Sequence, residues 1–533
     1  MDNFHDKVNF IWQVANDLLR GIFKKYEYSD IILPFLILRR LDCVIEKDTG
    51  NLKFYNTSNY NLKRLSQDEE NIELNFNLYI KGYSPNIQEI LENFHIDTIV
   101  SNLINNNCLF HLVGKFTEVD LHPDKVSNHQ MGYIFEELLR RFSEMSNETA
   151  GEHYTPREVI RLMVNLLLAE HSEELKGKSV KRTIYDPACG TGGMLTIAKE
   201  HILTNINPEV EIVLYGQELN PATFAIAKSD FLIMSENAAN IHKGSSFSND
   251  CLKDIKFDFM LSNPPFGVSW KKEQEFIKKE AKDPYGRFYN GLPRVSDGAL
   301  LFLQHMLSKV TDNGSRIAII FNGSPLFNGD AGSGESNIRK WIIENDWLEA
   351  IVALPTELFY NTGIATYIWI VTNRKSKKRA GKIQLINAVN FYKKMPKSLG
   401  NKRNYIAEED IHKITKLYSQ FDLEENEYVK IFPNEYFGYT KVTIETPQEG
   451  NNPNRRDYER IPLLQDIDED FEKDVKPFVP DAWMVRIKDK VGYEINFNRY
   501  FFKYEPLPDL EELRAEIMAF AEESHKLLME ILA

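Results

Sequence analysis

Cysteine is scarce in this chain, with four residues among 533. They stand alone at Cys43, Cys108, Cys189 and Cys251, so neither a zinc site nor a disulfide framework is expected. No apolar run approaches the ~18 residues of a membrane span. The first ten residues also lack the basic and then apolar layout of a secretory signal. These absences predict a cytoplasmic protein with no membrane segment and no bound metal.

Positive charge is also in short supply, because 64 Lys and Arg face 78 Asp and Glu, a net charge of −14. This balance argues against a protein that holds nucleic acid over its whole surface. Two segments depart from it: the range 374–404 has eleven Lys or Arg and no acid, and 270–296 has seven against four. Either segment fits a local contact with a polyanion, and either fits a solvated loop.

The length predicts two or three domains, because single cores rarely grow beyond ~250–300 residues. Residues 1–148 carry apolar side chains at helical spacing and no obvious chemical group, which predicts a helical N-terminal domain. Residues 149–445 alternate helical stretches with short apolar segments, which predicts an α/β domain with a mostly parallel sheet. Its strands are expected at 183–185, 211–215, 257–261, 316–321, 350–354 and 365–372.

Residues 446–533 form an acidic tail with proline-rich connections. Its last part, 509–532, is expected to be a helix with an apolar stripe. That stripe suits either a contact with another subunit or packing on its own domain.

A glycine-rich turn follows the first predicted strand, with the sequence Asp186-Pro187-Ala188-Cys189-Gly190-Thr191-Gly192-Gly193. Glycines there let backbone N–H groups approach a ligand closely. A phosphate loop would end in Gly-Lys-Ser/Thr, and a dinucleotide fingerprint would read Gly-x-Gly-x-x-Gly, so neither matches. The anion of Asp186 favours a ligand that carries an ammonium or sulfonium group. Glu218 ends the next strand, where a carboxylate can accept hydrogen bonds from ribose hydroxyls.

The tetrapeptide Asn263-Pro264-Pro265-Phe266, called NPPF below, follows the strand predicted at 257–261. An amine conjugated to an aromatic ring is a poor nucleophile because its lone pair is delocalised. The Asn263 carboxamide oxygen and the Pro264 carbonyl can accept both N–H hydrogens and free that lone pair. The prolines fix the carbonyl direction, and Phe266 offers a face for an extruded base. A simple Pro-Pro turn is the alternative.

A helix is expected to start near Thr155 and to run to about residue 170. Thr155 would cap it, Pro156 would occupy the first helical position, and Glu158 would close a capping box.

Together these motifs resemble the methylation (modification) subunits of type I restriction–modification systems. The family's Gly-x-x-Tyr-Thr-Pro element is matched by Gly151, Tyr154, Thr155 and Pro156. Its Asp-Pro-x-x-Gly-x-Gly-Gly turn is matched by residues 186–193, its ribose-binding acid by Glu218, and its Asn-Pro-Pro-Phe by NPPF. Further similar stretches lie at 297–305, 338–340, 359–363, 397–403 and 436–439, and the similarity is weakest beyond about 447.

The resemblance implies a class I S-adenosylmethionine-dependent methyltransferase fold and transfer of a methyl group to N6 of a flipped adenine in DNA. It implies catalytic roles for Asn263, Pro264, Pro265 and Phe266. The residues it implies for binding S-adenosyl-L-methionine are Glu152, His153, Tyr154, Thr155, Pro156, Arg157, Asp186, Gly190, Thr191, Gly192, Gly193 and Glu218.

The expected partners are DNA, a DNA-specificity subunit flanked by two methylation subunits, and a restriction/motor subunit. The tail is an unsuitable reader of a DNA groove. The chain also contains no Gly-x-x-x-x-Gly-Lys-Ser/Thr motor motif.

Two positions depart from the family pattern. His153 stands where the family usually has an aromatic ring. After the third strand the family often has Gly-Asp, whose acid contacts the cofactor adenine, whereas Gly244 is followed here by Ser245 and Ser246.

Two other functions use the same features. Enzymes that methylate guanine in ribosomal RNA or a protein glutamine amide also carry Asn-Pro-Pro-Phe/Tyr, but the helical N-terminal domain and the Tyr154-Thr155-Pro156 element argue against them. A catalytically silent scaffold subunit would have lost cofactor-site residues, and Asp186, Gly190, Gly192, Glu218 and Asn263 are all present.

Overall fold

A computed structural model describes residues 2–47, 50, 52–146, 155–170, 172–177, 179–360, 362–421, 426–447, 455–502 and 509–532. The chain divides into two compact units, Met1–Ile495 and Asn496–Ala533. In the described part, no helix is long and apolar enough to cross a membrane.

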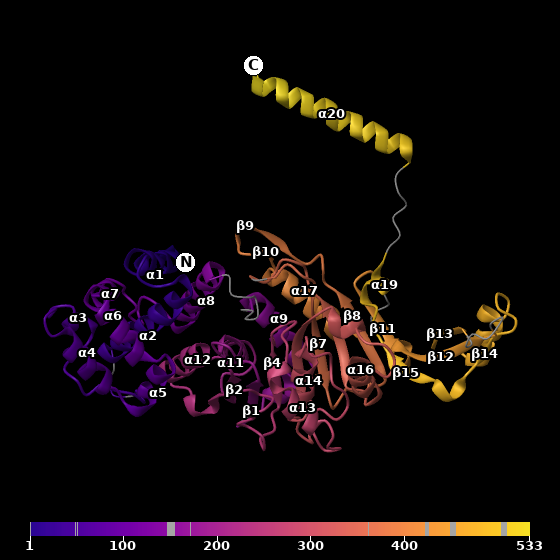
Figure 1. Cartoon of the computed structure of the whole chain (residues 1–533), viewed down its shortest axis with the longest axis horizontal. Helices are drawn as coiled ribbons and strands as arrows, with labels where there is room; N and C mark the ends of the chain where they lie inside the picture. The colour runs from indigo at the N-terminus through magenta and orange to yellow at the C-terminus, as the bar shows by residue number, and fades with distance from the viewer. Residues whose placement is uncertain are drawn as a thin grey trace. The chain divides into compact units, whose positions relative to one another are not determined.

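The N-terminal part of the first unit is helical, as the apolar spacing predicts (Figure 1). Its helices are α1 (Asp2–Leu19), α2 (Tyr28–Glu46), α3 (Leu62–Leu65), α4 (Ile72–Lys81), α5 (Pro85–Asn93), α6 (Ile96–Asn105), α7 (Leu109–Thr117) and α8 (Asn128–Ser146). The mostly apolar helix α2 lies at the centre of this group. Its Phe35 ring lies 5.7 Å from that of Phe76 and 5.8 Å from that of Phe116, centroid to centroid.

A nine-stranded sheet follows, in the order β11-β8-β6-β7-β5-β4-β1-β2-β3. Its strands are β1 (Lys181–Asp186), β2 (Glu211–Glu218), β3 (Ile241–Lys243), β4 (Phe259–Ser262), β5 (Arg316–Asn322), β6 (Leu348–Ala353), β7 (Thr366–Thr372), β8 (Lys382–Asn387) and β11 (Val429–Pro433). The half from β5 to β3 is parallel. Strand β7 runs antiparallel to β5 and β6 and is buried along its whole length.

Helices connect and cover these strands (Figure 1). They are α9 (Arg157–Leu168), α10 (Ser172–Leu175), α11 (Gly193–Asn205), α12 (Pro221–Ile233), α13 (Gln274–Glu280), α14 (Ala299–Leu307), α15 (Ser324–Phe327), α16 (Gly334–Glu344) and α17 (Glu408–Ser419). Helix α9 contacts both α11 and α17. Helix α12 contacts α2, α5 and α8, so it joins the N-terminal helices to the sheet domain. Lys228 of α12 and Glu89 of α5 add an ion pair of 2.5 Å to this contact.

All six strands with a predicted range are present, with ends that agree to within three residues, but three further strands of the sheet had no predicted range. Strand β3 has three residues, too few for a periodic pattern. Strand β8 lies inside the basic range 374–404, where the surrounding lysines obscure the apolar residues Ile383, Leu385 and Ile386. Edge strand β11 pairs with β8 and completes the sheet.

The region from Gly438 onwards contains strands that were not predicted. It contains β12 (Gly438–Thr446), β13 (Arg455–Pro462), α18 (Ile467–Asp470), β14 (Trp483–Met484) and β15 (Lys490–Tyr493), which form a small antiparallel sheet apart from the short helix. Strand β12 crosses the predicted boundary at 445, and the compact unit extends to Ile495. Six of the eight β13 residues are exposed in succession, so the strand lacks the apolar alternation by which a sequence reveals one. Arg339 of α16, 1% exposed, anchors this sheet by donating to the carbonyl of Tyr493 at 2.6 Å.

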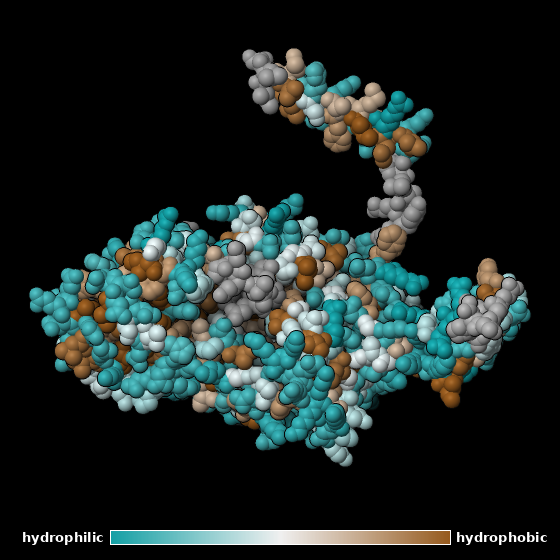
Figure 2. Space-filling view, in the orientation of Figure 1, coloured by the Kyte–Doolittle hydropathy of each residue, from teal (hydrophilic) through white to brown (hydrophobic). Residues whose placement is uncertain are grey.

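The second unit contains α19 (Phe497–Phe501) and the predicted terminal helix, α20 (Leu510–Leu532). Apolar side chains are exposed along α20, including Ile517 at 61%, Phe520 at 69% and Leu527 at 54% (Figure 2).

Candidate functional site

Three of the predicted functional residues lie at the ends of neighbouring parallel strands. Asp186 ends β1, Glu218 ends β2, and Asn263 directly follows β4. Strand β1 pairs with both β2 and β4, so their carboxyl ends meet at one edge of the sheet. Ligands of such sheets bind outside this edge. The structure therefore brings the three motifs together as the sequence predicted.

Asp186 is 2% exposed and its Oδ1 accepts two hydrogen bonds. The donors are the backbone N–H of Ala188 at 2.9 Å and the hydroxyl of Ser262, also at 2.9 Å. Burial raises the pKa of this carboxyl to about 7, which outweighs the two hydrogen bonds. A positively charged ligand at this position would favour the ionised carboxylate.

The glycine turn has the backbone shape that its composition predicts. Gly190 and Gly192 have φ of 53° and 79°, in the left-handed region, and Gly192 is the residue that caps α11. A Cβ at Gly192 would also lie 3.0 Å from the ring of Phe231. Glycine is therefore required at Gly192 for both backbone shape and space. Thr191 and Gly193, on either side of it, are half-buried.

Glu218 is tied to this turn through its carboxylate. One oxygen accepts the backbone N–H of Gly190 at 2.8 Å, and the other accepts that of Asn220 at 2.7 Å. Each carboxylate oxygen can accept a second hydrogen bond. These two bonds fix the side chain at the end of β2, the position predicted for a ribose-binding acid.

NPPF is held to the start of α9. Asn263 is 8% exposed, and its Nδ2 donates to the hydroxyl of Thr155 at 2.9 Å. Because this bond fixes the amide, the direction of its Oδ1 acceptor is fixed too. Pro264 is buried, Pro265 is half-buried and Phe266 is 9% exposed.

The capping box expected at Thr155 does not form. Helix α9 begins at Arg157 with Pro156 as the N-cap residue, and no side chain bonds to the cap. The hydroxyl of Thr155 instead accepts from Asn263, and Glu158 makes an ion pair with Lys402. Long-range partners therefore replace the local ones.

Of the other predicted cofactor contacts, Gly151, Glu152, His153 and Tyr154 lie outside the described residues. Arg157 is 7% exposed and its guanidinium faces α8. It lies 2.8 Å from Nδ1 of His129 and 3.7 Å from the ring centroid of Tyr133.

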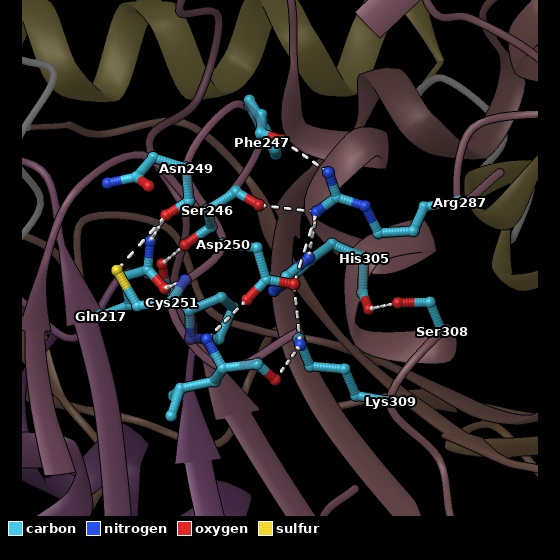
Figure 3. A network of polar contacts seen from close by, with 12 residues as sticks. Gln217, Ser246, Phe247, Asn249, Asp250, Cys251, Arg287, His305, Ser308 and Lys309 are labelled. Carbon is cyan, nitrogen blue, oxygen red and sulfur yellow. Dashed lines mark hydrogen bonds and ion pairs between the residues drawn. The ribbon is translucent and has the colours of Figure 1, made fainter. Parts of the chain in front are cut away.

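A polar network centred on Arg287 and His305 was not predicted (Figure 3). Arg287 donates to the backbone carbonyls of Ser246 and Phe247, at 2.7 and 2.5 Å, and pairs with Glu280 at 2.7 Å. Its Nη1 also lies 2.8 Å from His305, whose other ring nitrogen lies 3.0 Å from the Tyr185 hydroxyl.

This network connects Arg287 and His305, which follow NPPF in the sequence, to the glycine turn. Ser246 donates to the carbonyl of Pro187 in the glycine turn at 2.5 Å. Burial, and then Arg287 and Lys309, hold the pKa of His305 well below its usual range, so the ring is neutral and can accept from Arg287. The range 297–305 of the family resemblance, which ends at His305, was the one sequence signal for it. Ser245 occupies the position where the family often has the Asp of Gly-Asp. Its hydroxyl accepts a hydrogen bond of 3.1 Å from the backbone N–H of Phe247, within its own loop.

The cations of the basic range 374–404 include buried, paired side chains and exposed ones. Lys375, Arg379 and Lys402 are buried and paired with Asp346, Glu170 and Glu158, so they cannot reach a polyanion. Lys394 and Lys397 are exposed on the hairpin of β9 (Lys393–Leu399) and β10 (Lys402–Tyr405).

Chemically, the edge offers the backbone of a glycine turn, the fixed carboxylate of Glu218, the buried carboxylate of Asp186 and the oriented amide of Asn263. This donor set fits S-adenosylmethionine, whose sulfonium and ammonium are positive and whose nucleoside carries a ribose.

Comparisons with known proteins agree with this chemistry. A family model described as N-6 DNA Methylase matches residues 126–443, and one described as HsdM N-terminal domain matches residues 7–116. The type I restriction enzyme MjaIX methylase subunit of Methanocaldococcus jannaschii is 28% identical over 458 residues, 79% of this chain and 78% of that protein. The HindI methylase subunit of Haemophilus influenzae is 31% identical over 260 residues, 48% of this chain and 54% of that protein.

A solved type I restriction-modification methyltransferase subunit from Streptococcus thermophilus has the same fold, with a TM-score of 0.65 at 20% identity over 81% of this chain and 97% of that one. The fold, the enzyme class and the methyl donor expected from the motifs are therefore confirmed. Because the N-6 DNA Methylase model spans more than half of the chain, the protein belongs to that family, as an S-adenosylmethionine-dependent adenine-N6 DNA methyltransferase of the type I modification-subunit group.

Proposed function

We propose that the chain methylates an adenine turned out of the DNA duplex, as the methylation subunit of a cytoplasmic complex in which a separate DNA-specificity subunit selects the site. The observation that carries this proposal is the Asn263–Thr155 hydrogen bond beside the glycine turn. It orients an amide at the strand edge where the methyl donor fits.

The cofactor residues we propose are those of the glycine turn and strand ends, with Thr155, Pro156 and Arg157 at the start of α9. Asp186, Gly190, Thr191, Gly192, Gly193 and Glu218 would hold S-adenosylmethionine, which supplies an electrophilic methyl group when bound. The preceding Glu152, His153 and Tyr154 stay predictions.

The roles that we propose for NPPF rest on hydrogen-bonding chemistry. Asn263 Oδ1 and the Pro264 carbonyl would accept the two N6 hydrogens and make the nitrogen lone pair available for attack. Pro265 has no N–H that could compete for these acceptors. Phe266 would contact the face of the extruded base, and duplex unstacking would cost a few kcal/mol. No residue has to remove a proton before the methyl group is transferred.

The complex would need further chains. Helix α20 exposes Ile517, Phe520 and Leu527, and we propose that this stripe docks on helices of the specificity subunit. Two methylation subunits per specificity subunit, and a separate restriction/motor subunit, complete the proposal. Replacing Ile517 and Phe520 by Asp should abolish co-purification with the specificity subunit, whereas Glu522→Gln on the same helix should not. Retained co-purification of the double variant would contradict this docking site.

A labelling experiment tests the proposed substrate. The chain, alone and co-expressed with the proteins encoded by its genomic neighbours, is incubated with methyl-labelled cofactor and DNA, ribosomal RNA or protein. We expect label in N6-methyladenine of DNA, at one sequence, when both subunits are present. Label in ribosomal RNA or in glutamine amides, and none in DNA, would contradict the proposal.

A further inference from the structure

Glu136 of α8 reaches the glycine turn from the N-terminal helices. Its side chain is 13% exposed. A Cβ at Gly193, the first residue of α11, would lie 3.1 Å from Glu136 Oε1 and 3.9 Å from the Thr191 hydroxyl. The carboxylate therefore lies against the predicted cofactor turn, although it is 50 or more residues away in sequence from every motif there except the one at the start of α9.

The described residues make few polar contacts that could offset the cost of burying the Glu136 carboxylate. Its ion pair with Arg157 Nη2 spans 3.7 Å, and none of the side-chain hydrogen bonds of the described residues involves it. Burial raises its pKa, and Arg157 opposes the rise. A carboxylate that marks the start of a helix normally accepts backbone N–H bonds, and Glu136 accepts none from α11. If Glu136 had only a structural role, no hydrogen bond would offset the free energy lost when its carboxylate is buried.

Arg157 likewise has a buried polar atom without a hydrogen-bond partner, in this case a donor. It is 7% exposed, and its Nε is buried without a hydrogen-bond partner. Its Nη1 and Nη2 are used by His129, on the same helix as Glu136. Glu136, which lies against the glycine turn, and Arg157, which lies 3.7 Å from the Glu136 carboxylate, are thus an acceptor and a donor of opposite charge, and each has unused hydrogen-bonding capacity.

The amino-acid end of S-adenosylmethionine has the matching groups, an ammonium and a carboxylate on one carbon. We propose that Glu136 binds the cofactor's ammonium group and that Arg157 binds its carboxylate. The N-terminal N–H groups of α11 also suit that carboxylate. This inference rests on the proposed cofactor site, and it makes α8, outside the motifs, part of that site.

Binding of two nucleosides to the full-length chain tests the assignment. S-adenosylhomocysteine carries the amino-acid end, and 5′-methylthioadenosine lacks it. By titration calorimetry, Glu136→Gln should bind S-adenosylhomocysteine about ten- to a hundredfold more weakly, the range for a charged hydrogen bond. It should bind 5′-methylthioadenosine as the wild type does. Glu144→Gln, on the same helix but 46% exposed at its side chain, should bind both as the wild type does.

Thermal unfolding separates this role from a structural one. Because burial disfavours the ionised carboxylate, ligand-free Glu136→Gln should unfold at the wild-type temperature or above at pH 8. Glu136→Asp, which keeps the charge on a shorter arm, should lose less affinity than Glu136→Gln.

Three results would overturn the inference: equal weakening of both nucleosides, unchanged binding of S-adenosylhomocysteine, or a lowered unfolding temperature for Glu136→Gln. A wild-type chain that binds neither nucleoside would contradict the cofactor site and this inference together. A chain that binds both nucleosides but methylates no DNA when it is assembled with the specificity subunit would contradict the proposed substrate alone.

Discussion

Asn263 and Thr155 are 108 residues apart in the sequence, and a 2.9 Å hydrogen bond from Nδ2 to Oγ1 joins them. The bond connects the end of β4 to the residue before the N-cap of α9. If Asn263 acts on the substrate amine as we propose, this bond would let Thr155 orient its amide, a role that neither motif reveals when read alone.

Thr155→Val should therefore slow methyl transfer. The valine is nearly isosteric but accepts no hydrogen bond, and one neutral hydrogen bond is worth ~1 kcal/mol, which corresponds to about a five- to tenfold lower kcat. Thr155→Ser keeps the hydroxyl and should retain most of the rate. Single-turnover methylation of DNA by the assembled complex measures this. Equal rates for the valine and serine variants would show that the bond does not position Asn263.

Asn263→Ala should abolish methylation and spare cofactor binding. The substitution removes the acceptor for the substrate amine, and loss of one preorganised polar group at a reacting centre typically lowers kcat by ~10²–10³-fold. Affinity for S-adenosylhomocysteine, measured by calorimetry, should stay within about twofold of wild type. The reason is that Asn263 is assigned to the target base in DNA, which is absent from this titration. Lost nucleoside binding would instead place Asn263 among the cofactor residues.

Cofactor affinity should depend on pH through Asp186. Its folded pKa of about 7 lies above the usual 3.8, so its contribution to ligand-free stability is full below about pH 4 and is lost as pH rises through 7. A cationic ligand favours the ionised form. Affinity for S-adenosylmethionine should thus rise from pH 5.5 to 7.5, by up to about tenfold per pH unit, and then level off.

The control for this dependence is Asp186→Asn. Its amide oxygen can still accept from Ala188 and Ser262, but it does not titrate. The variant should bind more weakly and with a flatter pH profile. A wild-type affinity that is constant across this range would show that Asp186 is already ionised in the free protein.

The meeting of the three motifs at one edge of the sheet could be predicted from sequence because each motif is local. Asp186, Glu218 and Asn263 each follow an apolar strand, and in a parallel sheet such positions must meet at one edge. The turn glycines likewise reveal themselves by composition. Tertiary pairing was not predictable, because a side chain's partner depends on segments that only the fold brings together. Thr155 illustrates this, since its local pattern favoured a capping box and its actual partner is Asn263.

Charge patterns were the less reliable guide for the same reason. The eleven cations of 374–404 look like one basic patch in the sequence. In the structure, however, the side chains of Lys375, Arg379 and Lys402 are buried and form ion pairs with carboxylates of this chain. Strand β8 within this range was missed because its apolar core is short. A sequence gives net charge, and the fold decides which charges reach solvent.

Arg287→Lys should destabilise the protein and weaken cofactor binding. Lysine cannot reproduce the planar fork that pairs with Glu280 and donates to Ser246 and Phe247. Breaking a largely buried pair typically costs ~3 kcal/mol, measurable by urea unfolding. Because Ser246 holds Pro187, the affinity for S-adenosylmethionine should fall too. Arg294→Lys, 49% exposed at its side chain, should change neither. Unaltered affinity in a destabilised Arg287→Lys would confine the network to a structural role.

The exposed cations of the β9–β10 hairpin should contribute to DNA binding. Lys394, Lys397 and Arg403 are exposed on it, and Arg403 makes one loose ion pair with Glu357 at 3.7 Å. Replacing all three by Gln should weaken DNA binding by the complex and flatten its salt dependence, by about 0.9 in the log–log slope for each phosphate that the hairpin no longer neutralises. Lys125→Gln, exposed before α8, serves as the control and should leave the slope unchanged. An unchanged slope in the triple variant would make the hairpin a solvated loop, and this chain would then have to bind DNA through another segment, with 270–296 as the next candidate.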